Sequence, residues 1–307
     1  MTTELLARAD RLRDERTPYV LATVVRAERP TSAKAGDRAI VLADGTIEGF
    51  VGGVCAESTV RLQGLRLLGH GESTLLRITP IDGDEEVVDE TAPEGLVVVG
   101  NPCLSGGTLD IFLEAVLPPT LVHVFGAAPI ARAMESVARA SGFAVTATTD
   151  PDAPIAPDTS AVVVASHGRD EEKVLARALA AQVPYIGLIA SRRRGMAVVS
   201  ELDLPEDVRA KVRTPAGLDI GARTPLEIAV SVVAELVSVK AELHPAPKPT
   251  PRQPLPMVSM EAIDPVCGMT VAAVPTSLQL ELEGKTWYFC GPGCKQAFAD
   301  NPKAYGG

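Results

Sequence analysis

An alternation of strand-like and helix-like segments between Thr120 and Ala190 most constrains the fold of this chain. Apolar segments of strand length alternate with helical patterns, and they occupy residues 121–125, 143–148, 161–165 and 185–190. In the first helical stretch, Ile130, Met134 and Val137 share one face. Strands separated by helices pair in parallel through crossover connections. The sequence therefore predicts the α/β class, with a Rossmann-like, doubly wound parallel sheet over residues 118–243.

The segments on either side of this sheet predict three further parts. Residues 1–117 precede a Pro-Pro pair and predict an α+β domain, with a helix over 4–16 and strands over 19–26, 38–42 and 45–50. Six prolines between His244 and Pro256 exclude helix and favour an extended linker of about 3 Å per residue. We expect this linker, residues 244–260, to hold a small cysteine-rich module, residues 261–307, apart from the main body.

Charge and cysteine content narrow the class of protein. The net charge of −10 argues against a nucleic acid or an anionic membrane as the main partner. The N-terminus has no secretory pattern and no apolar run reaches membrane-spanning length, so we expect no membrane insertion. Five cysteines without a secretion signal indicate a reduced, cytoplasmic protein with metal-binding or reactive thiols.

Three of the five cysteines lie in the C-terminal module. Cys290 and Cys294 flank a Gly-Pro-Gly turn, and Cys267 lies near the start of the module. A hairpin of strands 278–282 and 286–290 is expected before a short helix that begins near Gly293 and carries Cys294 in its first turn. Three thiolates suit a soft metal such as Cu(I) or Zn. The alternative is a set of buried core thiols.

The C-terminal module closely resembles a YHS domain, a small metal-binding module related to the TRASH group. The matching residues are Asp264, Pro265, Val266, Cys267, Gly268 and Met269, followed by Gly284, Tyr288, Phe289, Cys290, Cys294, Phe298, Asn301, Pro302 and Tyr305. The family often has Ser where this chain has Gly291, and the module contains no His. The sequence thus shows no fourth protein ligand, which favours a low-coordinate site or one open to a partner.

The glycine turn after the first parallel strand departs from a dinucleotide fingerprint. Gly126 begins the turn, but Ala128 replaces the second glycine and Pro129 removes an amide donor. Asp150 is placed for a ribose hydroxyl, although an Asp after a strand is commonly a turn residue. Tight NAD(P) binding by the usual contacts is therefore disfavoured.

Polar residues follow the later strands at the edge where α/β sheets bind ligands. His167 follows the third strand, Ser191, Arg192 and Arg193 follow the fourth, and Asp219 lies in a loop before a helix that begins at Pro225. The alternatives are that the His is structural and that the Arg residues form a solvated surface. The position of the His and Arg residues at one edge of the sheet favours an anionic, phosphate-bearing ligand.

Most of the chain before the linker resembles the XdhC/CoxI family of accessory proteins that mature molybdenum hydroxylases. The resemblance is carried by Gly52-Gly53-Val54-Cys55-Ala56-Glu57, Asn101-Pro102-Cys103-Leu104-Ser105-Gly106-Gly107, Ser166-His167, the segment Tyr185 to Arg193, and Gly217-Leu218-Asp219-Ile220-Gly221. It implies a protein that binds molybdenum cofactor, assists its sulfuration by a cysteine desulfurase and delivers it to an apo molybdenum hydroxylase. The implied cofactor-binding residues are Gly52, Gly53, Cys55, Glu57, Cys103, Gly106, Gly107, Gly126, Asp150, His167, Ser191, Arg192, Arg193 and Asp219.

The two glycine-cysteine elements fit this role physically. Their glycine pairs allow backbone amides to approach an anion, and Cys55 and Cys103 add soft sulfur atoms for molybdenum or for carrying sulfur. Two buried cysteines beside turn glycines are the alternative.

The combined interpretation is a non-catalytic maturation factor rather than an enzyme. A molybdenum chaperone joined to a soft-metal module favours a client of the xanthine dehydrogenase or aerobic carbon monoxide dehydrogenase type, the latter pairing molybdenum with copper. An NAD(P)-dependent oxidoreductase with a metal-binding tail, or a metal sensor or storage protein, are the rival functions. A homodimer is a further possibility that the sequence leaves open.

Overall fold

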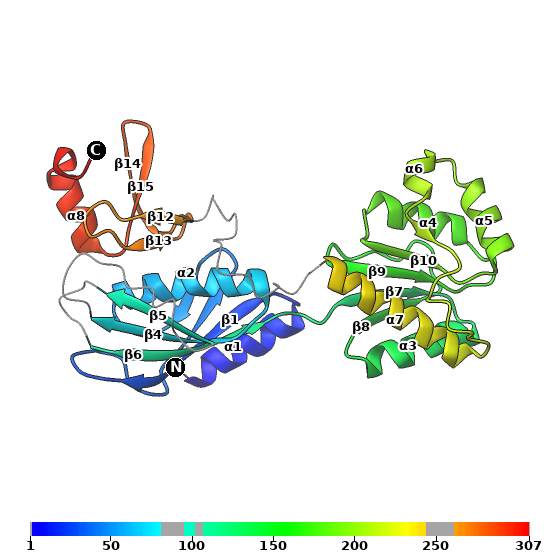
Figure 1. Cartoon of the computed structure of the whole chain (residues 1–307), viewed down its shortest axis with the longest axis horizontal. Coiled ribbons are helices and arrows are strands. Elements are labelled where there is room, and N and C mark those ends of the chain that lie inside the picture. The colour runs from blue at the N-terminus through cyan, green and yellow to red at the C-terminus, as the bar shows by residue number, and fades with distance from the viewer. Residues whose placement is uncertain (1, 81–94, 102–106, 244–260, 307) are drawn as a thin grey trace. The chain divides into compact units, whose positions relative to one another are not determined.

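The structure is a computed structural model that describes residues 2–80, 95–101, 107–243 and 261–306. The chain forms two compact units, Met1–Pro118 with Gln253–Gly307, and Pro119–Arg252. Figure 1 shows the elements of each unit. Within the described ranges, no helix combines the length and the apolar character needed to cross a membrane.

The first unit contains a six-stranded sheet in the order β3-β2-β1-β6-β4-β5. Neighbouring strands are antiparallel except for the parallel pair β4 and β5. The strands are β1 (Tyr19–Ala27), β2 (Arg38–Leu42), β3 (Ile47–Gly49), β4 (Thr74–Pro80), β5 (Leu96–Asn101) and β6 (Leu109–Val116). The mixed α and β character expected for this part of the chain is confirmed.

Two helices cover opposite faces of this sheet. Tyr19 and Leu21 of β1 pack with α1 (Thr2–Asp14), whereas Val20 and Ala22 belong to the core beneath α2 (Val54–His70). This division follows from the alternation of side chains along a strand. The sequence pattern does not predict α2, because apolar residues occur on two faces of this helix and obscure the helical period.

The C-terminal module forms two small hairpins and a helix. It consists of β12 (Glu261–Ile263), β13 (Thr270–Ala272), β14 (Leu278–Leu282), β15 (Lys285–Phe289), α8 (Pro292–Asp300) and a 3-10 turn (Pro302–Tyr305). The predicted hairpin is confirmed, and Glu283 and Gly284 adopt positive φ angles of 53° and 79° in its two-residue turn. Phe298 packs against Phe289 and Trp287 to form a small aromatic core.

The module packs against the outer face of α2 rather than lying apart from the N-terminal domain. Leu62 and Leu65 of α2 form one apolar cluster with Ala272 and Val274 of the module. An ion pair joins Arg66 of α2 to Glu261 at 2.9 Å. The expectation that the linker holds the module apart from the N-terminal domain is therefore corrected. Apolar side chains on α2 and on the module favour contact between them. The linker, residues 244–260, lies outside the described residues.

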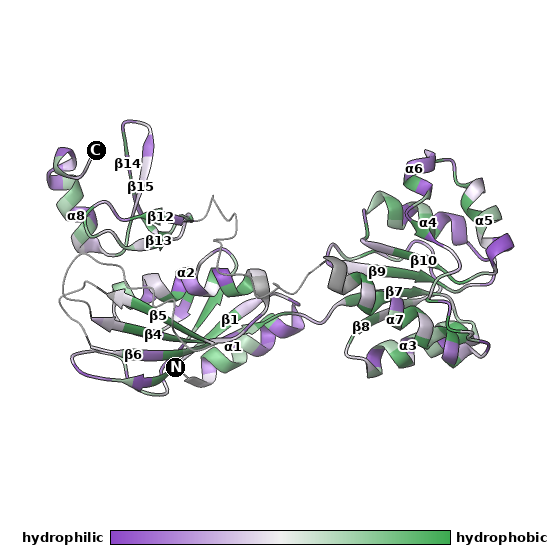
Figure 2. Cartoon of the chain, viewed as in Figure 1, coloured by the Kyte–Doolittle hydropathy of each residue, from purple (hydrophilic) through white to green (hydrophobic). Residues whose placement is uncertain are grey.

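The second unit is the predicted parallel sheet. Its order is β11-β10-β9-β7-β8, with β7 (Leu121–Phe125), β8 (Ala144–Thr148), β9 (Thr159–Val164), β10 (Tyr185–Leu188) and β11 (Val212–Arg213). Helices α3 (Pro129–Ala140) and α7 (Pro225–Leu243) cover one face, while α4 (Glu171–Ala180) and α5 (Arg192–Glu201) cover the other, with α6 (Glu206–Arg209) after α5. Figure 2 shows the apolar central strands that both layers bury. This arrangement confirms the doubly wound α/β prediction.

Candidate functional site

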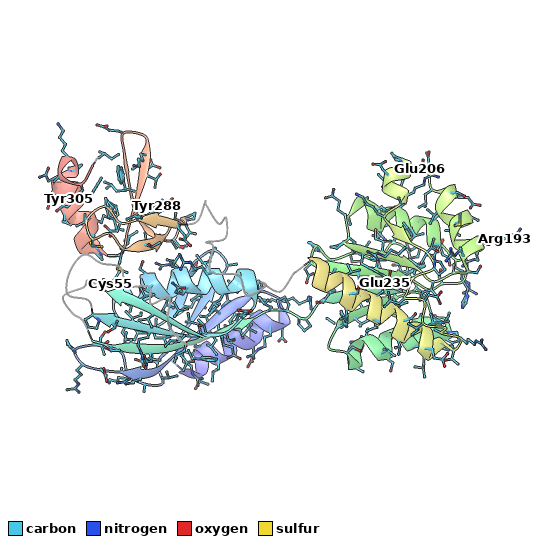
Figure 3. All side chains as sticks on the ribbon, in the orientation of Figure 1. Cys55, Arg193, Glu206, Glu235, Tyr288 and Tyr305 are labelled. Atoms are coloured by element: carbon cyan, nitrogen blue, oxygen red, sulfur yellow. The ribbon has the colours of Figure 1, made fainter. Side chains whose placement is uncertain are left out.

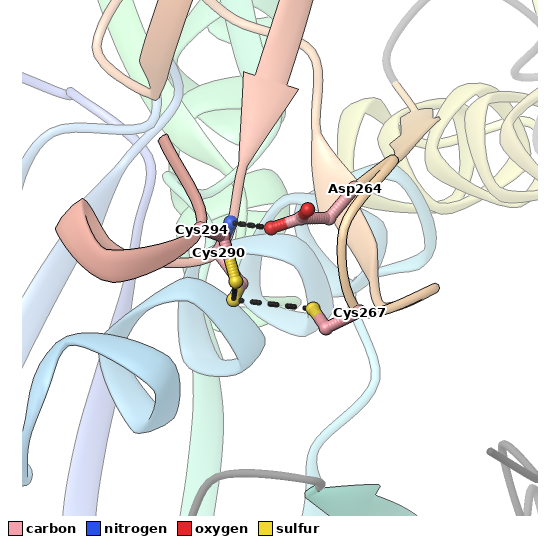
Figure 4. Close-up of side chains that lie close together, drawn as sticks. All are labelled: Asp264, Cys267, Cys290 and Cys294. Carbon is pink, nitrogen blue, oxygen red and sulfur yellow. Dashed lines mark hydrogen bonds between the residues drawn. The ribbon is translucent and has the colours of Figure 1, made fainter. Parts of the chain in front are cut away.

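The three cysteines of the C-terminal module converge on one centre (Figure 4). Cys267 lies in the loop between β12 and β13, Cys290 directly follows β15, and Cys294 lies in the first turn of α8. The Sγ atom of Cys290 is 3.5 Å from that of Cys267 and 3.7 Å from that of Cys294. These sulfur atoms and a carboxylate oxygen of Asp264 all lie within 4.8 Å of one another. The arrangement suits a thiophilic metal ion.

Asp264 organises the loops that carry the thiols. Its side chain is fully buried, and its two carboxylate oxygens accept the backbone N–H groups of Cys290 at 2.8 Å and Val266 at 2.9 Å. These two hydrogen bonds fix the loops that carry Cys267 and Cys290, which is the role of an outer-shell group. Asp264 is also a candidate ligand, since one of its oxygens lies within 4.8 Å of all three sulfur atoms. The sequence gives Asp264 no role beyond its match to the YHS pattern, because its hydrogen bond with Cys290 joins residues 26 positions apart.

The thiols differ in their readiness to ionise. The hydrogen bond from Cys290 lowers the pKa of Cys267 below the usual thiol value. Contacts with the Cys267 and Cys55 thiols, together with burial, raise the pKa of Cys290. Burial and the nearby charge of Asp264 raise the pKa of Cys294 to about 12. A metal ion must therefore displace protons from at least two of the three thiols near neutral pH.

Cys55 lies beside these thiols, although it comes from the N-terminal domain. It occupies the first turn of α2 and packs against the apolar cluster that contains Cys290. Gly291, the N-cap of α8, lies so near that a Cβ atom there would be 3.9 Å from Cys55 Sγ. Figure 3 labels Cys55 at the start of its helix. The linker predicts that Cys55 lies away from the module's site, and the packing of the module on α2 corrects that expectation.

The other predicted residues of the N-terminal domain divide by local structure. Gly53 is the exposed N-cap of α2, and Glu57 lies in the first turn of that helix. Gly52 has a φ of 141°, and a Cβ atom there would lie 3.0 Å from Ala56. A Cβ atom on Gly107 would lie 1.9 Å from the Glu28 carbonyl oxygen, so backbone packing requires this glycine. Cys103 and Gly106 lie outside the described residues.

In the second unit, a pocket of about 670 Å³ opens beyond the carboxyl ends of β9 and β10. His167 and Ser191, which follow these strands, line it together with Arg192 and Asp219. The structure therefore brings four predicted residues to one cavity, and their role as a cofactor site stays a prediction. The volume lies within the usual range for small-molecule sites.

The pocket wall is built around a buried carboxylate. Glu171 is fully buried, forms an ion pair with Arg194, and accepts the backbone N–H of Gly168 at 2.7 Å. Ser191 is the N-cap of α5 and accepts the N–H of Arg194 at 3.4 Å. Among the described residues, Arg192 forms no ion pair, and it lies at the pocket in the first turn of α5. A helix N-terminus with an available guanidinium is suited to an anion.

Three predicted residues do not line this pocket. A Cβ atom on Gly126 would lie 2.3 Å from the Ala165 carbonyl oxygen, so close packing between strand ends requires that glycine. Asp150 accepts the N–H of Asp152 at 2.9 Å in a local turn. Arg193 is exposed and is absent from the pocket lining (Figure 3). The cofactor role predicted for Gly126, Asp150 and Arg193 stays a prediction.

Three protein families match successive parts of the chain. Residues 12–79 match the XdhC and CoxI family, residues 122–236 match the XdhC Rossmann domain, and residues 262–307 match the YHS domain.

Individual relatives match over longer stretches. The chain is 27% identical over 266 residues to the uncharacterized protein YqeB of Escherichia coli (strain K12), covering 77% of this chain and 46% of that protein. It is 24% identical over 268 residues to the molybdenum cofactor insertion chaperone PaoD of the same organism, covering 72% of this chain and 83% of PaoD. A probable xanthine dehydrogenase component of Bacillus subtilis (strain 168) is 27% identical over 158 residues, covering 43% of this chain and 47% of that protein.

The chain thus spans about half the length of two of these relatives. A solved xanthine dehydrogenase structure from Bacillus halodurans aligns with 80% of this chain and 98% of its own, at 18% identity and a TM-score of 0.39. The three family matches and the relatives together identify the chain as a member of the XdhC/CoxI family that carries a C-terminal YHS domain.

Proposed function

We propose that this protein is a maturation factor that binds molybdenum cofactor and assists its sulfuration and its insertion into a molybdenum hydroxylase. The observation that carries the proposal is the pocket at the start of α5, where Arg192 and a helix N-terminus offer an anion site. The similarity to PaoD, named as a molybdenum cofactor insertion chaperone, supports the same role.

Within this proposal, the pocket holds the phosphate of the pterin cofactor. Arg192 supplies a charge-assisted hydrogen bond, and backbone N–H groups at the start of α5, other than the Arg194 N–H that Ser191 caps, supply further donors. His167 and Asp219 line the same cavity and offer hydrogen bonds to the polar edge of a pterin. Glu171 binds the Gly168 N–H next to His167 and the guanidinium of Arg194 in α5, so it ties these two parts of the pocket wall together.

Cys55 is the proposed thiol for sulfur handling in the N-terminal domain. It lies in the first turn of α2, where the helix dipole stabilises a thiolate. Such a thiolate accepts the outer sulfur of a desulfurase persulfide, and the desulfurase cysteine leaves as its own thiolate. The apo hydroxylase and the cysteine desulfurase are the partners that this role requires.

The C-terminal module is proposed to hold a thiophilic ion, Cu(I) or Zn(II), on Cys267, Cys290 and Cys294. A copper-loaded module would suit a client of the aerobic carbon monoxide dehydrogenase type. To test this, the client is matured with the full chain and with a chain lacking residues 261–307. Full copper loading of the client by the shortened chain would rule out copper delivery.

The cofactor proposal is tested by co-expression with cofactor biosynthesis and native mass spectrometry. We expect Arg192→Ala to lower the retained molybdopterin about tenfold or more, since it removes a charged hydrogen bond of about 1.5–3 kcal/mol. Arg193→Ala is the matched control, because this neighbour is exposed and lies outside the pocket lining. Equal retention by both variants would contradict the assigned pocket.

The rival function, an NAD(P)-dependent oxidoreductase, rests on the parallel sheet and on Asp150 after β8. Neither Gly126 nor Asp150 lines the pocket of the second unit, which favours the maturation role. Titrating the purified chain with NADH while following its fluorescence separates the two functions. Micromolar binding would favour the oxidoreductase.

A further inference from the structure

The proposed metal site of the module has three sulfur donors of its own, and its fourth candidate group is the carboxylate of Asp264. The module contains no His, and both carboxylate oxygens of Asp264 are held by backbone amides. Cys267, Cys290 and Cys294 therefore supply three sulfur atoms to the centre. Zn(II) and similar divalent ions in structural sites take four ligands in a tetrahedron. A fourth thiolate, which would leave Asp264 to its two amide hydrogen bonds, has to come from elsewhere in the chain.

Cys55 of the N-terminal domain lies next to Cys290. Its side chain packs against the cluster of Met269, Val271 and Cys290, and its thiol contacts that of Cys290. The start of α2 adjoins the start of α8. A Cβ atom placed on Gly291, the N-cap of α8, would lie 3.9 Å from both Cys55 Sγ and a methyl carbon of Val54. Two helix N-termini thus face the centre, and their dipoles offset the negative charge that thiolates would bring.

We infer that Cys55 joins Cys267, Cys290 and Cys294 in a four-thiolate site for a tetrahedral divalent ion of the Zn(II) type, formed between the N-terminal domain and the YHS domain. The inference deepens the proposed function, since it rests on the metal site of the module. Binding replaces the thiol protons, which pass to the solvent, and four thiolates with one divalent cation carry a net charge of −2. The ion fastens the module to α2 beyond the contacts of Leu62 and Leu65.

A coordinated Cys55 thiolate cannot also receive sulfur. Metal loading of the module therefore blocks the thiol that the cofactor role requires. When Cys55 leaves the centre, it leaves three thiolates, an arrangement that Cu(I) accepts more readily than Zn(II) does. Whether Cys55 coordinates the metal ion thus couples metal binding in the YHS domain to sulfur handling in the N-terminal domain.

Cobalt substitution of the full-length chain tests the inference, because thiolate-to-cobalt charge-transfer absorption grows with the number of thiolate ligands. We expect the wild-type protein to give a tetrahedral four-thiolate spectrum and Cys55→Ser to lose about a quarter of the charge-transfer intensity. Glu261→Gln is the matched control, because it weakens the same interface through the Arg66 ion pair without removing a sulfur atom. Its spectrum should equal that of the wild type.

A second readout follows the thiols directly. Stoichiometric Zn(II) should slow alkylation of Cys55 by at least tenfold in the full chain, as quantified by peptide mass spectrometry. In Cys290→Ser this protection of Cys55 should be lost. An unchanged cobalt spectrum in Cys55→Ser, or undiminished alkylation of Cys55 in the metal-loaded wild type, overturns the inference while leaving a three-thiol module intact. Failure of the wild type to bind Co(II) or Zn(II) overturns it as well, together with the proposed zinc site.

Discussion

At the scale of single residues, the buried carboxylate of Asp264 orders the loops that carry the thiols of the module. Asp264 accepts two backbone N–H groups, and one of them belongs to Cys290. The direction of the Cys290 side chain therefore depends on a buried charge. The spacing of Cys290 and Cys294 around a Gly-Pro-Gly turn predicts that their thiols converge, and the structure brings them to 3.7 Å. The role of Asp264 could not be predicted, because it depends on the return of β15 past the loop after β12.

Asp264→Asn tests this organising role. An amide side chain keeps one acceptor oxygen but turns an NH2 group toward a backbone donor, so one of the two N–H groups loses its partner. We expect metal affinity to fall about ten- to hundredfold while the number of sulfur ligands stays the same. Affinity is measured by competition with a chelator, and ligand identity by X-ray absorption. A lost oxygen ligand in the absorption spectrum would instead identify Asp264 as a direct ligand.

At the scale of elements, α2 is a helix with two buried faces. Ala56 and Val60 pack on the sheet, whereas Leu62 and Leu65 pack on the module. This double burial hid the helix from periodicity analysis, which detects a single apolar stripe. The helix predicted to begin at Pro225 is confirmed as α7, whose start has a local signal: the Thr224 N–H donates to the Glu227 carboxylate at 2.9 Å.

Leu65→Asp should detach the module from α2 and leave the sheet folded. A carboxylate in the apolar cluster with Ala272 and Val274 loses its hydration, at a cost of about 2 kcal/mol or more. Hydrogen exchange should then rise in β13 and α8 but not in β1 or β6. Arg66→Ala is the graded comparison, because its exposed ion pair with Glu261 contributes only about 0.2–1 kcal/mol. Fast exchange throughout the sheet would show that Leu65 supports the whole domain.

The sheet of the first unit contains a buried acidic residue between two arginines. Asp110 on β6 lies directly opposite Arg77 on β4, with N–O distances of 2.7 and 3.0 Å, and Arg26 on β1 approaches from the other side. The hydrogen bonds from Arg77 lower the pKa of Asp110. A cross-strand pair of this kind also fixes the register of the two strands.

Asp110→Asn should lower the free energy of unfolding at pH 7 by about 2 kcal/mol, the magnitude of a charged hydrogen bond. A carboxyl with a depressed folded-state pKa stabilises the protein above its unfolded pKa of about 4, and this contribution disappears as the pH falls through the lower folded value. The variant should therefore lose less stability than the wild type between about pH 4 and pH 2. The free energy of unfolding is measured by urea denaturation at each pH. If it fell equally with pH in the wild type and in Asp110→Asn, the stabilising role of the Asp110 carboxylate would be contradicted.

At the scale of the whole molecule, local sequence patterns identify the parts but not how they associate. The proline-rich linker indicates a separate module, yet the module and the N-terminal domain share apolar clusters and one thiol centre. Arg66 and Glu261 meet across 195 residues of sequence, a separation that no local pattern encodes. The chain therefore has a thiol-bearing unit and a parallel-sheet unit, and these are expected to unfold as two cooperative bodies.

Calorimetry of the full-length chain should accordingly show two transitions, of which only one responds to metal. A free metal concentration of one hundred times Kd stabilises the binding unit by about 2.7 kcal/mol. For a unit of this size, that free energy raises the midpoint by about 5–10 °C. The transition of the parallel-sheet unit should not move, because all four thiols of the candidate site lie in the other unit. Cys290→Ser should abolish the metal response and retain both transitions, whereas a single transition that shifts as a whole would show that the two units unfold together.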